Sequence, residues 1–328
     1  MKLIIQIPCF DEEKTLPATV ADLPREVPGF DEVEYLVIDD GSTDRTYQVA
    51  RDLGIHHIVR FSGNRGLARA FMAGVDASLR AGADVIVNTD ADNQYSAEAI
   101  PALVEPIVEG RADMVIGDRK VASVSEFSST KKRLQRFGSW VVRKASSLEV
   151  PDATSGFRAM SRDAALGLNV TTDFTYTLET IIQAGAARMT VGAVPVETNP
   201  PTRGSRLFRG MWSYVRRSAG TIVRIYTMYN PLRTFLTLAA VLMGLGIAAG
   251  ARWLYFFFTT EGDTGHTQSL ILAAIMVLAA FQVALFGMVA DLVGANRRLM
   301  EAVLKRVRRI EAGRGDRPAG ARDGEPEG

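Results

Sequence analysis

Two carboxylates, Asp90 and Asp92, stand two positions apart directly after a strand-like run at residues 84–87. The run is short and rich in β-branched residues, and turn residues follow it, so it predicts a buried strand. Residues i and i+2 of an extended chain point to the same side, so both carboxylates would converge, with Gln94 continuing the row. Converging carboxylates repel unless a cation lies between them, and such oxygen ligands suit Mg²⁺ or Mn²⁺. A solvated Asx turn is the alternative.

Strand and helix patterns alternate over residues 1–200 and indicate one α/β domain. Alternation with short connections predicts a Rossmann-like, mainly parallel sheet covered by helices on both faces. The expected strands lie at residues 3–7, 35–38, 58–59, 85–87 and 114–116, and the expected helices near residues 15–23, 45–53, 67–80 and 97–108.

Polar clusters follow three of the expected strands, at residues 8–12, 39–42 and 90–92. Ligands of open α/β sheets bind at the carboxyl ends of the strands, so these clusters should meet at one edge and form a site. The sequence contains neither a G-x-G-x-x-G pattern nor a Walker A pattern, which disfavours dinucleotide binding and P-loop chemistry.

Charge is segregated along the chain, although the formal net charge is only +1. No acidic residue occurs between Glu197 and Glu261, and that interval holds eight arginines. Such a block needs an anionic partner, either phosphate groups or an anionic membrane face. The single cysteine, Cys9, excludes an internal disulfide and fits a reducing compartment.

Two long apolar segments predict transmembrane helices at residues 233–258 and 269–291. Each reaches the ~20 apolar residues that a span needs. The connecting loop, residues 259–268, has no Lys or Arg, whereas basic residues flank the outer ends of both segments. The positive-inside rule therefore places this loop outside the cytoplasm, and both termini and the α/β domain inside. A buried helical hairpin of a soluble protein is the alternative.

Amphipathic patterns at residues 129–148 and within the juxtamembrane segment 201–232 predict two further helices. We expect them to lie on the bilayer, with their cations near lipid phosphates, and packing against the sheet is the alternative. A basic cytoplasmic helix is expected at residues 292–312, and it could mediate self-association or lie on the membrane. Its apolar residues at a/d-like spacing are Met300, Val303, Val307 and Ile310. The tail, residues 313–328, should be disordered.

With these features, the chain resembles family 2 glycosyltransferases of the dolichol-phosphate mannose synthase and polyprenyl-phosphate glycosyltransferase group. The resemblance extends from Leu3 to about Tyr226. It rests on five motifs in the family's order, which are Ile7-Pro8-Cys9-Phe10-Asp11-Glu12-Glu13, Ile38-Asp39-Asp40-Gly41-Ser42-Thr43-Asp44, Asp90-Ala91-Asp92-Asn93-Gln94, Ser155-Gly156-Phe157-Arg158 and Arg203-Gly204-Ser205-Arg206. The chain departs from the family pattern at Asp11, where Asn is usual, at Asn93, where an apolar residue is common, and at Arg206, where Lys is common.

The resemblance implies an A-type glycosyltransferase fold that uses a nucleotide-activated sugar and a divalent metal, Mg²⁺ or Mn²⁺. Carried over by position, the nucleotide-sugar site would comprise Pro8, Phe10, Glu12, Ile38, Asp40, Asp90 and Ala91. Asp92 and Gln94 would hold the metal, and Asp90 would share it. Arg119, Arg203 and Arg206 would contact phosphates of donor or acceptor, and solvated surface charge or contact with lipid headgroups is the alternative. Glu179 matches an acidic position of the family and would orient an acceptor-side arginine such as Arg158, and a helix residue with a local partner is the alternative.

The implied reaction is attack of a lipid phosphate oxygen on the anomeric carbon of the sugar, with inversion and loss of a nucleoside diphosphate. A phosphate monoester has a second pKa of ~6, so this nucleophile needs no strong general base at neutral pH. That suits a chain with three histidines, of which His56 and His57 are expected to be structural.

We therefore expect a membrane-bound enzyme that moves a hexose from a UDP- or GDP-sugar to polyprenyl phosphate, dolichyl or undecaprenyl, at the cytoplasmic leaflet. Its expected partners are the donor, the acceptor and membrane lipids, with no nucleic acid, and whether the chain forms a homo-oligomer is left open. A processive polysaccharide synthase is an alternative, but such enzymes usually have more spans and a Gln-x-x-Arg-Trp motif, which we do not find. A catalytically silent membrane scaffold is the other alternative.

Overall fold

The computed structural model describes residues 1–119, 148, 150–170, 176–199, 220, 223–224, 226–259 and 267–314. Nearly all of the predicted amphipathic segment 129–148, most of residues 201–232, most of the loop 259–268 and the tail beyond residue 314 lie outside the described residues, as do Arg203 and Arg206. The chain divides into two compact units, Met1–Ile222 with Glu301–Gly328, and Val223–Met300.

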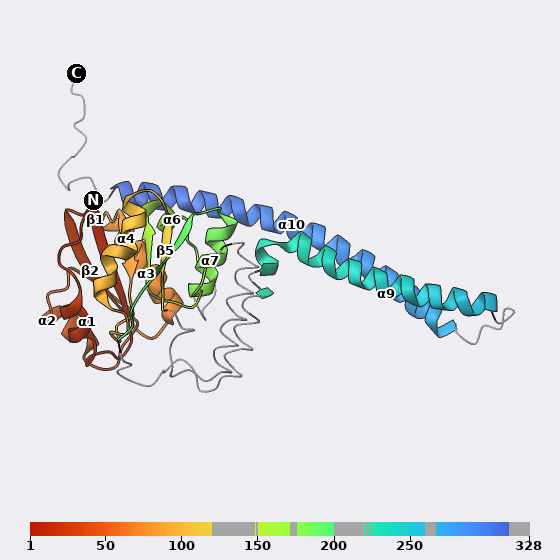
Figure 1. Ribbon diagram of the computed structural model, residues 1–328, viewed down its shortest axis with the longest axis horizontal. Coiled ribbons are helices and arrows are strands. Elements are labelled where there is room, and N and C mark those ends of the chain that lie inside the picture. The colour runs from red at the N-terminus through yellow and green to blue at the C-terminus, as the bar shows by residue number, and fades with distance from the viewer. Residues whose placement is uncertain are drawn as a thin grey trace, which may run out of the picture. The chain divides into compact units, whose positions relative to one another are not determined.

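The first unit is built on one mixed sheet, as Figure 1 shows. Its seven strands within the described residues are β1 (Lys2–Cys9), β2 (Glu32–Asp39), β3 (His57–Arg60), β4 (Val85–Asn88), β5 (Met114–Asp118), β6 (Arg158–Ser161) and β7 (Val191–Pro195). They are ordered β3-β2-β1-β4-β6-β5-β7, and only β6 runs antiparallel to its neighbours. The predicted mainly parallel sheet is confirmed, whereas the antiparallel β6 is an addition.

Helices cover both faces of this sheet, as the alternation of buried residues requires. Along β1, Leu3, Ile5 and Ile7 belong to one core cluster, whereas Ile4 belongs to a second cluster with Phe71 of α3. Successive strand residues point to opposite faces, so β1 is apolar on both sides and lies in the middle of the fold. The helical elements are α1 (Leu16–Asp22), α2 (Thr46–Asp52), α3 (Leu67–Arg80), the 3₁₀ helix η1 (Ala97–Ala99), α4 (Ile100–Val108), α6 (Arg162–Gly167) and α7 (Tyr176–Ala186).

One edge of the sheet collects the polar clusters that the sequence places after the strands. The parallel pairings bring the carboxyl ends of β1, β2, β3 and β4 to this edge. The two antiparallel pairings of β6 bring the carboxyl end of β5 and the start of β6 to the same edge. A binding site assembled from the loops after these strands is the expected result for such a sheet.

Two long apolar helices, α9 (Pro231–Thr259) and α10 (Thr267–Arg314), follow the α/β domain in sequence. Their most apolar windows have mean hydropathies of 1.9 and 2.5, yet only 11% and 17% of those windows are buried. A core helix of a soluble protein would be mostly buried, so the low burial of both helices supports membrane spans rather than the hairpin of a soluble core.

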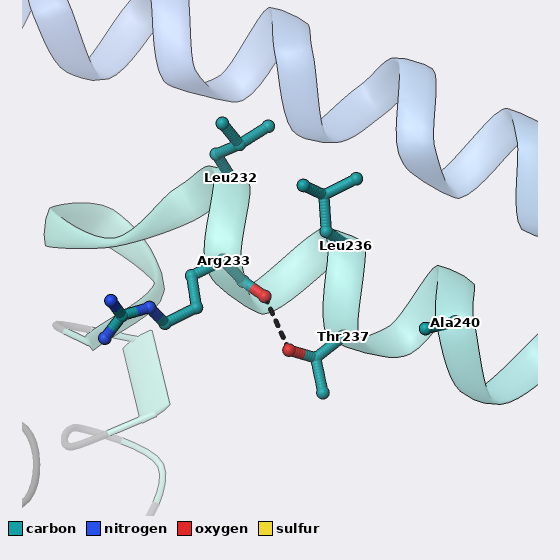
Figure 2. A pocket seen from close by; sticks show the side chains of 5 residues that line it. All are labelled: Leu232, Arg233, Leu236, Thr237 and Ala240. Atoms are coloured by element: carbon teal, nitrogen blue, oxygen red, sulfur yellow. Dashed lines mark hydrogen bonds between the residues drawn. The ribbon is translucent and has the colours of Figure 1, made fainter.

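Small residues allow α9 to pack against the first part of α10 within the second unit. Gly246 lies against Ala273, and Gly287 lies against Phe235. Close approach through small residues is typical of helices packed in a membrane. Figure 2 shows a shallow pocket on α9 in which Leu232 and Leu236 point toward the neighbouring helix.

The last turns of α10, from Glu301 onward, belong to the first unit and pack on it. Ala312 is buried in the core cluster on the α3 side of the sheet. Arg308 forms an ion pair with Asp76 at 3.2 Å and donates a hydrogen bond to the carbonyl oxygen of Leu168. The predicted a/d residues of this segment remain exposed, so self-association and membrane contact both stay predictions.

Candidate active site

The segment that carries Asp90 and Asp92 is a turn after β4, not the extended row that the sequence suggested. Asn93 has a left-handed φ of 55°, and the Gln94 N–H donates to Asp92 Oδ1 at 3.2 Å. This i to i+2 bond is that of an Asx turn, so the alternative interpretation was right about local geometry. Long-range bonds hold the turn in place, including one from Thr19 Oγ1 to the carbonyl of Ala91 at 3.0 Å.

The electrostatics of this turn fit a divalent cation. Burial first and the negative charge of Asp92 second raise the pKa of Asp90 to about 7, against the opposing charges of Arg119 and Arg158. Two carboxylates that raise each other's cost of ionisation are stabilised by a cation between them. Among the residues that the structure describes, no group of three or more His, Cys, Asp or Glu could hold a metal. Two carboxylates and the Gln94 amide would leave coordination positions for phosphate oxygens, as Mg²⁺ and Mn²⁺ sites commonly do.

The first two motifs are tied to each other by hydrogen bonds from Asp11, which has a φ of 54°. Its N–H donates to Ser42 Oγ at 3.0 Å, and its Oδ1 accepts from the Thr43 N–H at 2.8 Å. A carboxylate oxygen accepts such a bond as an amide oxygen would, so the departure from Asn preserves this connection. The loops after β1 and β2 are thereby joined into one wall of the site.

Asp40 joins that wall to the start of α3. Its two carboxylate oxygens accept the backbone N–H groups of Arg65 at 2.7 Å and Gly66 at 2.9 Å. Burial raises the pKa of Asp40, although these two hydrogen bonds oppose the shift. The contact also needs Gly41, whose φ is +71° and whose missing Cβ would lie 2.3 Å from the carbonyl carbon of Gly63.

A pocket of about 360 Å³ opens where β2 and β3 end. Arg60 on its rim is held by Asp39 at 3.1 Å and lies 4.5 Å from the centre of the Tyr47 ring. The volume of this pocket is in the range of small-molecule sites. The lining residues are Gly41, Ser42, Arg60, Phe61 and Ser62.

The other residues expected at the nucleotide differ in their access to a ligand. Phe10 is 37% exposed, whereas Pro8 is buried. Glu12 is nearly buried and its Oε2 accepts from Thr15 Oγ1 at 2.6 Å. Ile38 is fully buried in the core beside α3, so any contact with a nucleoside would use its backbone. Their roles at the nucleotide stay predictions.

Gly156, in the loop before β6, lies directly against the carboxylate of Asp90. A Cβ on Gly156 would be 3.1 Å from both oxygens of Asp90 and 2.9 Å from the hydroxyl of Tyr176. The Gly156 N–H donates to the Tyr95 hydroxyl at 3.1 Å, and its carbonyl accepts from Asn88 Nδ2 at 2.9 Å. Both backbone groups of this residue are therefore fixed, and the loop forms the floor beside Asp90.

Asn88 owes its position to Gln6, which donates to Asn88 Oδ1 at 2.8 Å from the middle of β1. Sequence reasoning did not assign this pair. The available signal was Gln6 itself, a polar residue inside an otherwise apolar strand, because a buried polar group must find a partner.

Arg119, predicted to contact phosphate, follows β5 at the same edge and forms a bidentate ion pair with Asp152. Arg119 Nε lies 2.6 Å from Asp152 Oδ2, and Nη2 lies 3.1 Å from Oδ1. Burial opposes the ionisation of Asp152, but the guanidinium of Arg119 outweighs it and keeps the pKa of Asp152 below its usual value. Sequence reasoning missed Asp152, because no local pattern marks a partner 33 residues away.

Arg158 and Glu179 are both fully buried, which gives them surroundings different from those of a ligand-facing residue. Arg158 donates to the carbonyl oxygens of Ser155 and Thr177 and to Thr180 Oγ1, so it fixes the loop before β6 to α7. Glu179 accepts from Gln183 Nε2 at 3.3 Å. The role predicted for Glu179 in orienting an arginine stays a prediction.

The two histidines of β3 and its preceding turn have structural partners, as predicted. His56 Nδ1 accepts the backbone N–H of Tyr35 at 3.1 Å, and His57 Nε2 lies 2.8 Å from Glu34 Oε2. Neither bond involves the loops around Asp90.

Solved structures with the same architecture show which fold this domain has. Glucosyl-3-phosphoglycerate synthase from Mycobacterium tuberculosis, crystallised with Mn²⁺, uridine diphosphate and glucosyl-3-phosphoglycerate, matches with a TM-score of 0.54 and 17% identity. The match covers 70% of this chain and 79% of that chain. The predicted A-type glycosyltransferase fold is confirmed.

Sequence comparisons then establish the family. The sequence model described as glycosyl transferase family 2 matches residues 4–167, half of the chain. The chain is 32% identical over 177 residues to undecaprenyl-phosphate mannosyltransferase from Micrococcus luteus, covering 52% of this chain and 70% of that protein. It is 26% identical over 324 residues to the prophage bactoprenol glucosyl transferase homolog of Escherichia coli, covering 94% of this chain and 100% of that protein. The chain belongs to glycosyl transferase family 2 and is a glycosyltransferase.

Proposed function

We propose that this protein transfers a hexose from a nucleotide-sugar to polyprenyl phosphate at the cytoplasmic leaflet of a membrane. The observation that carries the proposal is a carboxylate-bearing site at the strand ends of a glycosyltransferase domain whose own chain continues into two apolar helices. Membrane helices suit an acceptor whose hydrocarbon chain lies in the bilayer. The relatives named for undecaprenyl-phosphate and bactoprenol support the same class of acceptor.

The proposed step is an inverting displacement. A lipid phosphate oxygen forms a bond to the anomeric carbon while the bond from that carbon to the donor diphosphate breaks, releasing a nucleoside diphosphate. The nucleophile is already largely ionised at neutral pH, since its second pKa is ~6. The residues of the chain would therefore bind, orient and shield charge, without needing to remove a proton.

The main requirement of this step is that the negative charge on the departing diphosphate be stabilised. Asp92 and Gln94, joined by Asp90, would hold Mg²⁺ or Mn²⁺, which neutralises diphosphate charge when bound. Arg119, fixed at the same edge, would contact a phosphate. Arg203 and Arg206 are proposed for the same task from the sequence alone.

We also propose that the loop between the two spans faces away from the cytoplasm and that both termini are cytoplasmic. The distribution of basic residues at the outer flanks of the spans supports this topology. Under it, the site at the strand ends meets cytoplasmic nucleotide-sugars.

The test is a transfer reaction with purified protein in mixed micelles containing undecaprenyl phosphate, Mn²⁺ and a panel of UDP- and GDP-hexoses. Mass spectrometry of the lipid fraction should show a new hexosyl phospholipid for the wild type. Asp92→Asn should lower the rate at least about 100-fold, because it removes a ligand of the metal that would neutralise charge on the diphosphate. Asp163→Asn, a matched change in an exposed ion pair of α6, should retain the rate.

Each failure has its own meaning. Nucleoside diphosphate release without a new lipid would reject polyprenyl phosphate as the acceptor. Full activity of Asp92→Asn would reject the metal-ligand assignment while leaving the reaction intact.

A further inference from the structure

Arg119 is held by three hydrogen bonds, two to Asp152 and one to Thr154. The side chain of Arg119 is 25% exposed, and that of its partner Asp152 is only 2% exposed. Nε and Nη2 of Arg119 each donate to a different oxygen of Asp152, the fork geometry that fixes both the position and the plane of a guanidinium.

Thr154 completes this arrangement from the same loop. Its hydroxyl oxygen accepts a hydrogen bond from Arg119 Nη2 at 2.9 Å and lies 2.9 Å from Asp152 Oδ1, to which it donates. The Thr154 N–H also donates to Asp152 Oδ1 at 3.2 Å. The carboxylate that orients Arg119 is thus itself fixed by two bonds within the loop.

These contacts use only part of the donor capacity of Arg119. A guanidinium has five N–H donors, and the bonds to Asp152 and Thr154 employ Nε and Nη2. Among the described residues, Nη1 makes no hydrogen bond with the protein. Arg119 directly follows β5, whose carboxyl end lies at the same sheet edge as that of β4, which the Asp90 turn follows.

We propose that Asp152 and Thr154 are positioning residues that hold Arg119 with Nη1 directed to the diphosphate of the donor. The inference rests on the proposed function, in which Arg119 contacts a phosphate. A free arginine side chain loses rotamer freedom when it binds a ligand, and a fork fixed in advance avoids that loss. Small errors in the placement of a charge-stabilising group cost up to about 100-fold in rate, so the orienting pair matters as much as the charge.

The test compares substitutions of Asp152 and Thr154 with those of Arg119 in the full-length protein. Asp152→Asn keeps the size of the side chain but removes the charge, and it should lower kcat/KM by about 30-fold. Asp152→Glu, which keeps a carboxylate, should recover part of this loss. Thr154→Val retains the ion pair but loses both hydrogen bonds of the hydroxyl, to Arg119 Nη2 and to Asp152 Oδ1, so it should lower kcat/KM by at least about fivefold. Combining Asp152→Asn with Arg119→Met should be no worse than Arg119→Met alone.

A binding measurement separates positioning from general damage to the fold. Titration calorimetry with UDP and uridine, and with GDP and guanosine, should show weaker binding of the diphosphate to Asp152→Asn and unchanged binding of the nucleoside. Equal weakening of both would mean that the loop has collapsed, which overturns the positioning role. Asp76→Asn is the control, because it removes the carboxylate of another partly buried Arg–Asp pair, formed by Asp76 of α3 and Arg308 of α10, and it should bind both ligands normally.

The outcomes distinguish this inference from the proposed function. Wild-type activity and diphosphate affinity in Asp152→Asn, together with a defect in Arg119→Met, would overturn the inference alone. Normal activity of Arg119→Met would also overturn the inference, while it would leave the proposed transfer reaction intact. Failure of the wild-type protein to form a lipid-linked hexose would instead reject the proposed function.

Discussion

Replacing Gly41 by alanine should disturb the site through a contact between two loops. Gly41 has a φ of +71°, and a Cβ there would lie 2.3 Å from the carbonyl carbon of Gly63 and 2.7 Å from the Asn64 nitrogen. Non-bonded carbon atoms prefer a separation of about 3.5–4.0 Å, so the loop that contains Gly63 and Asn64 must move away by about 1 Å. The same loop supplies the N–H groups of Arg65 and Gly66, whose hydrogen bonds Asp40 accepts.

Two costs add in this variant. A left-handed φ costs a non-glycine residue about 1–2 kcal/mol, and overpacking against backbone costs about 1–3 kcal/mol. Gly41→Ala should therefore lose about 2–5 kcal/mol of stability. Weakening one charge-assisted hydrogen bond to Asp40 is worth about 1.5 kcal/mol, which corresponds to a roughly tenfold higher KM for the nucleotide-sugar.

Gly54→Ala is the matched control. Its φ is +68°, but no atom lies within 4 Å of the missing Cβ, so it carries only the backbone cost. Thermal melting and donor KM should be measured for both variants in the same detergent. Equal melting temperatures and equal KM values for the two variants would refute the loop contact and the role given to Asp40.

Three further outcomes follow from charges and buried bonds. In metal-free protein, burial and the carboxylate of Asp92 raise the pKa of Asp90 to about 7. Because a proton then competes with the cation for Asp90, the Mn²⁺ affinity measured by calorimetry should be about tenfold weaker at pH 6 than at pH 8. Arg308→Ala should destabilise the protein by about 1–2 kcal/mol through its bonds to Asp76 and the Leu168 carbonyl, whereas Arg309→Ala, whose ion pair is exposed, should leave the melting temperature unchanged. Arg158→Met should lower the free energy of unfolding by about 3–5 kcal/mol, because it leaves three buried oxygen acceptors without their donor. It should therefore lower the melting temperature more than either Arg308→Ala or Arg309→Ala.

Periodicity and turn chemistry predicted the architecture well where contacts are local or repeat regularly. The apolar strand β1, with cores on both faces, could be read directly from its residues, and so could the polar clusters at the strand ends. The antiparallel β6 could not, because its short run from Arg158 to Ser161 has little strand pattern and its pairing is set by neighbours far away in sequence.

Pairing within the candidate site was the least predictable part, for the same reason. The sequence indicated that Asp90, Asp92 and Arg119 belong together, but not that Asp152 orients Arg119. The extended row expected at Asp90 became a turn because bonds from α1 and from Asn199 hold the loop in a different conformation. Such long-range bonds leave no local sequence signal.

The central claim is that a hexose is attached to a polyprenyl phosphate by inverting displacement at the carboxylate site. The most direct measurement is the linkage and anomeric configuration of the purified lipid product, determined by NMR from reactions with a donor of known configuration. We predict one glycosidic bond to the lipid phosphate with the configuration opposite to that of the donor. Retention of configuration, or a sugar attached to anything other than that phosphate, would contradict the account.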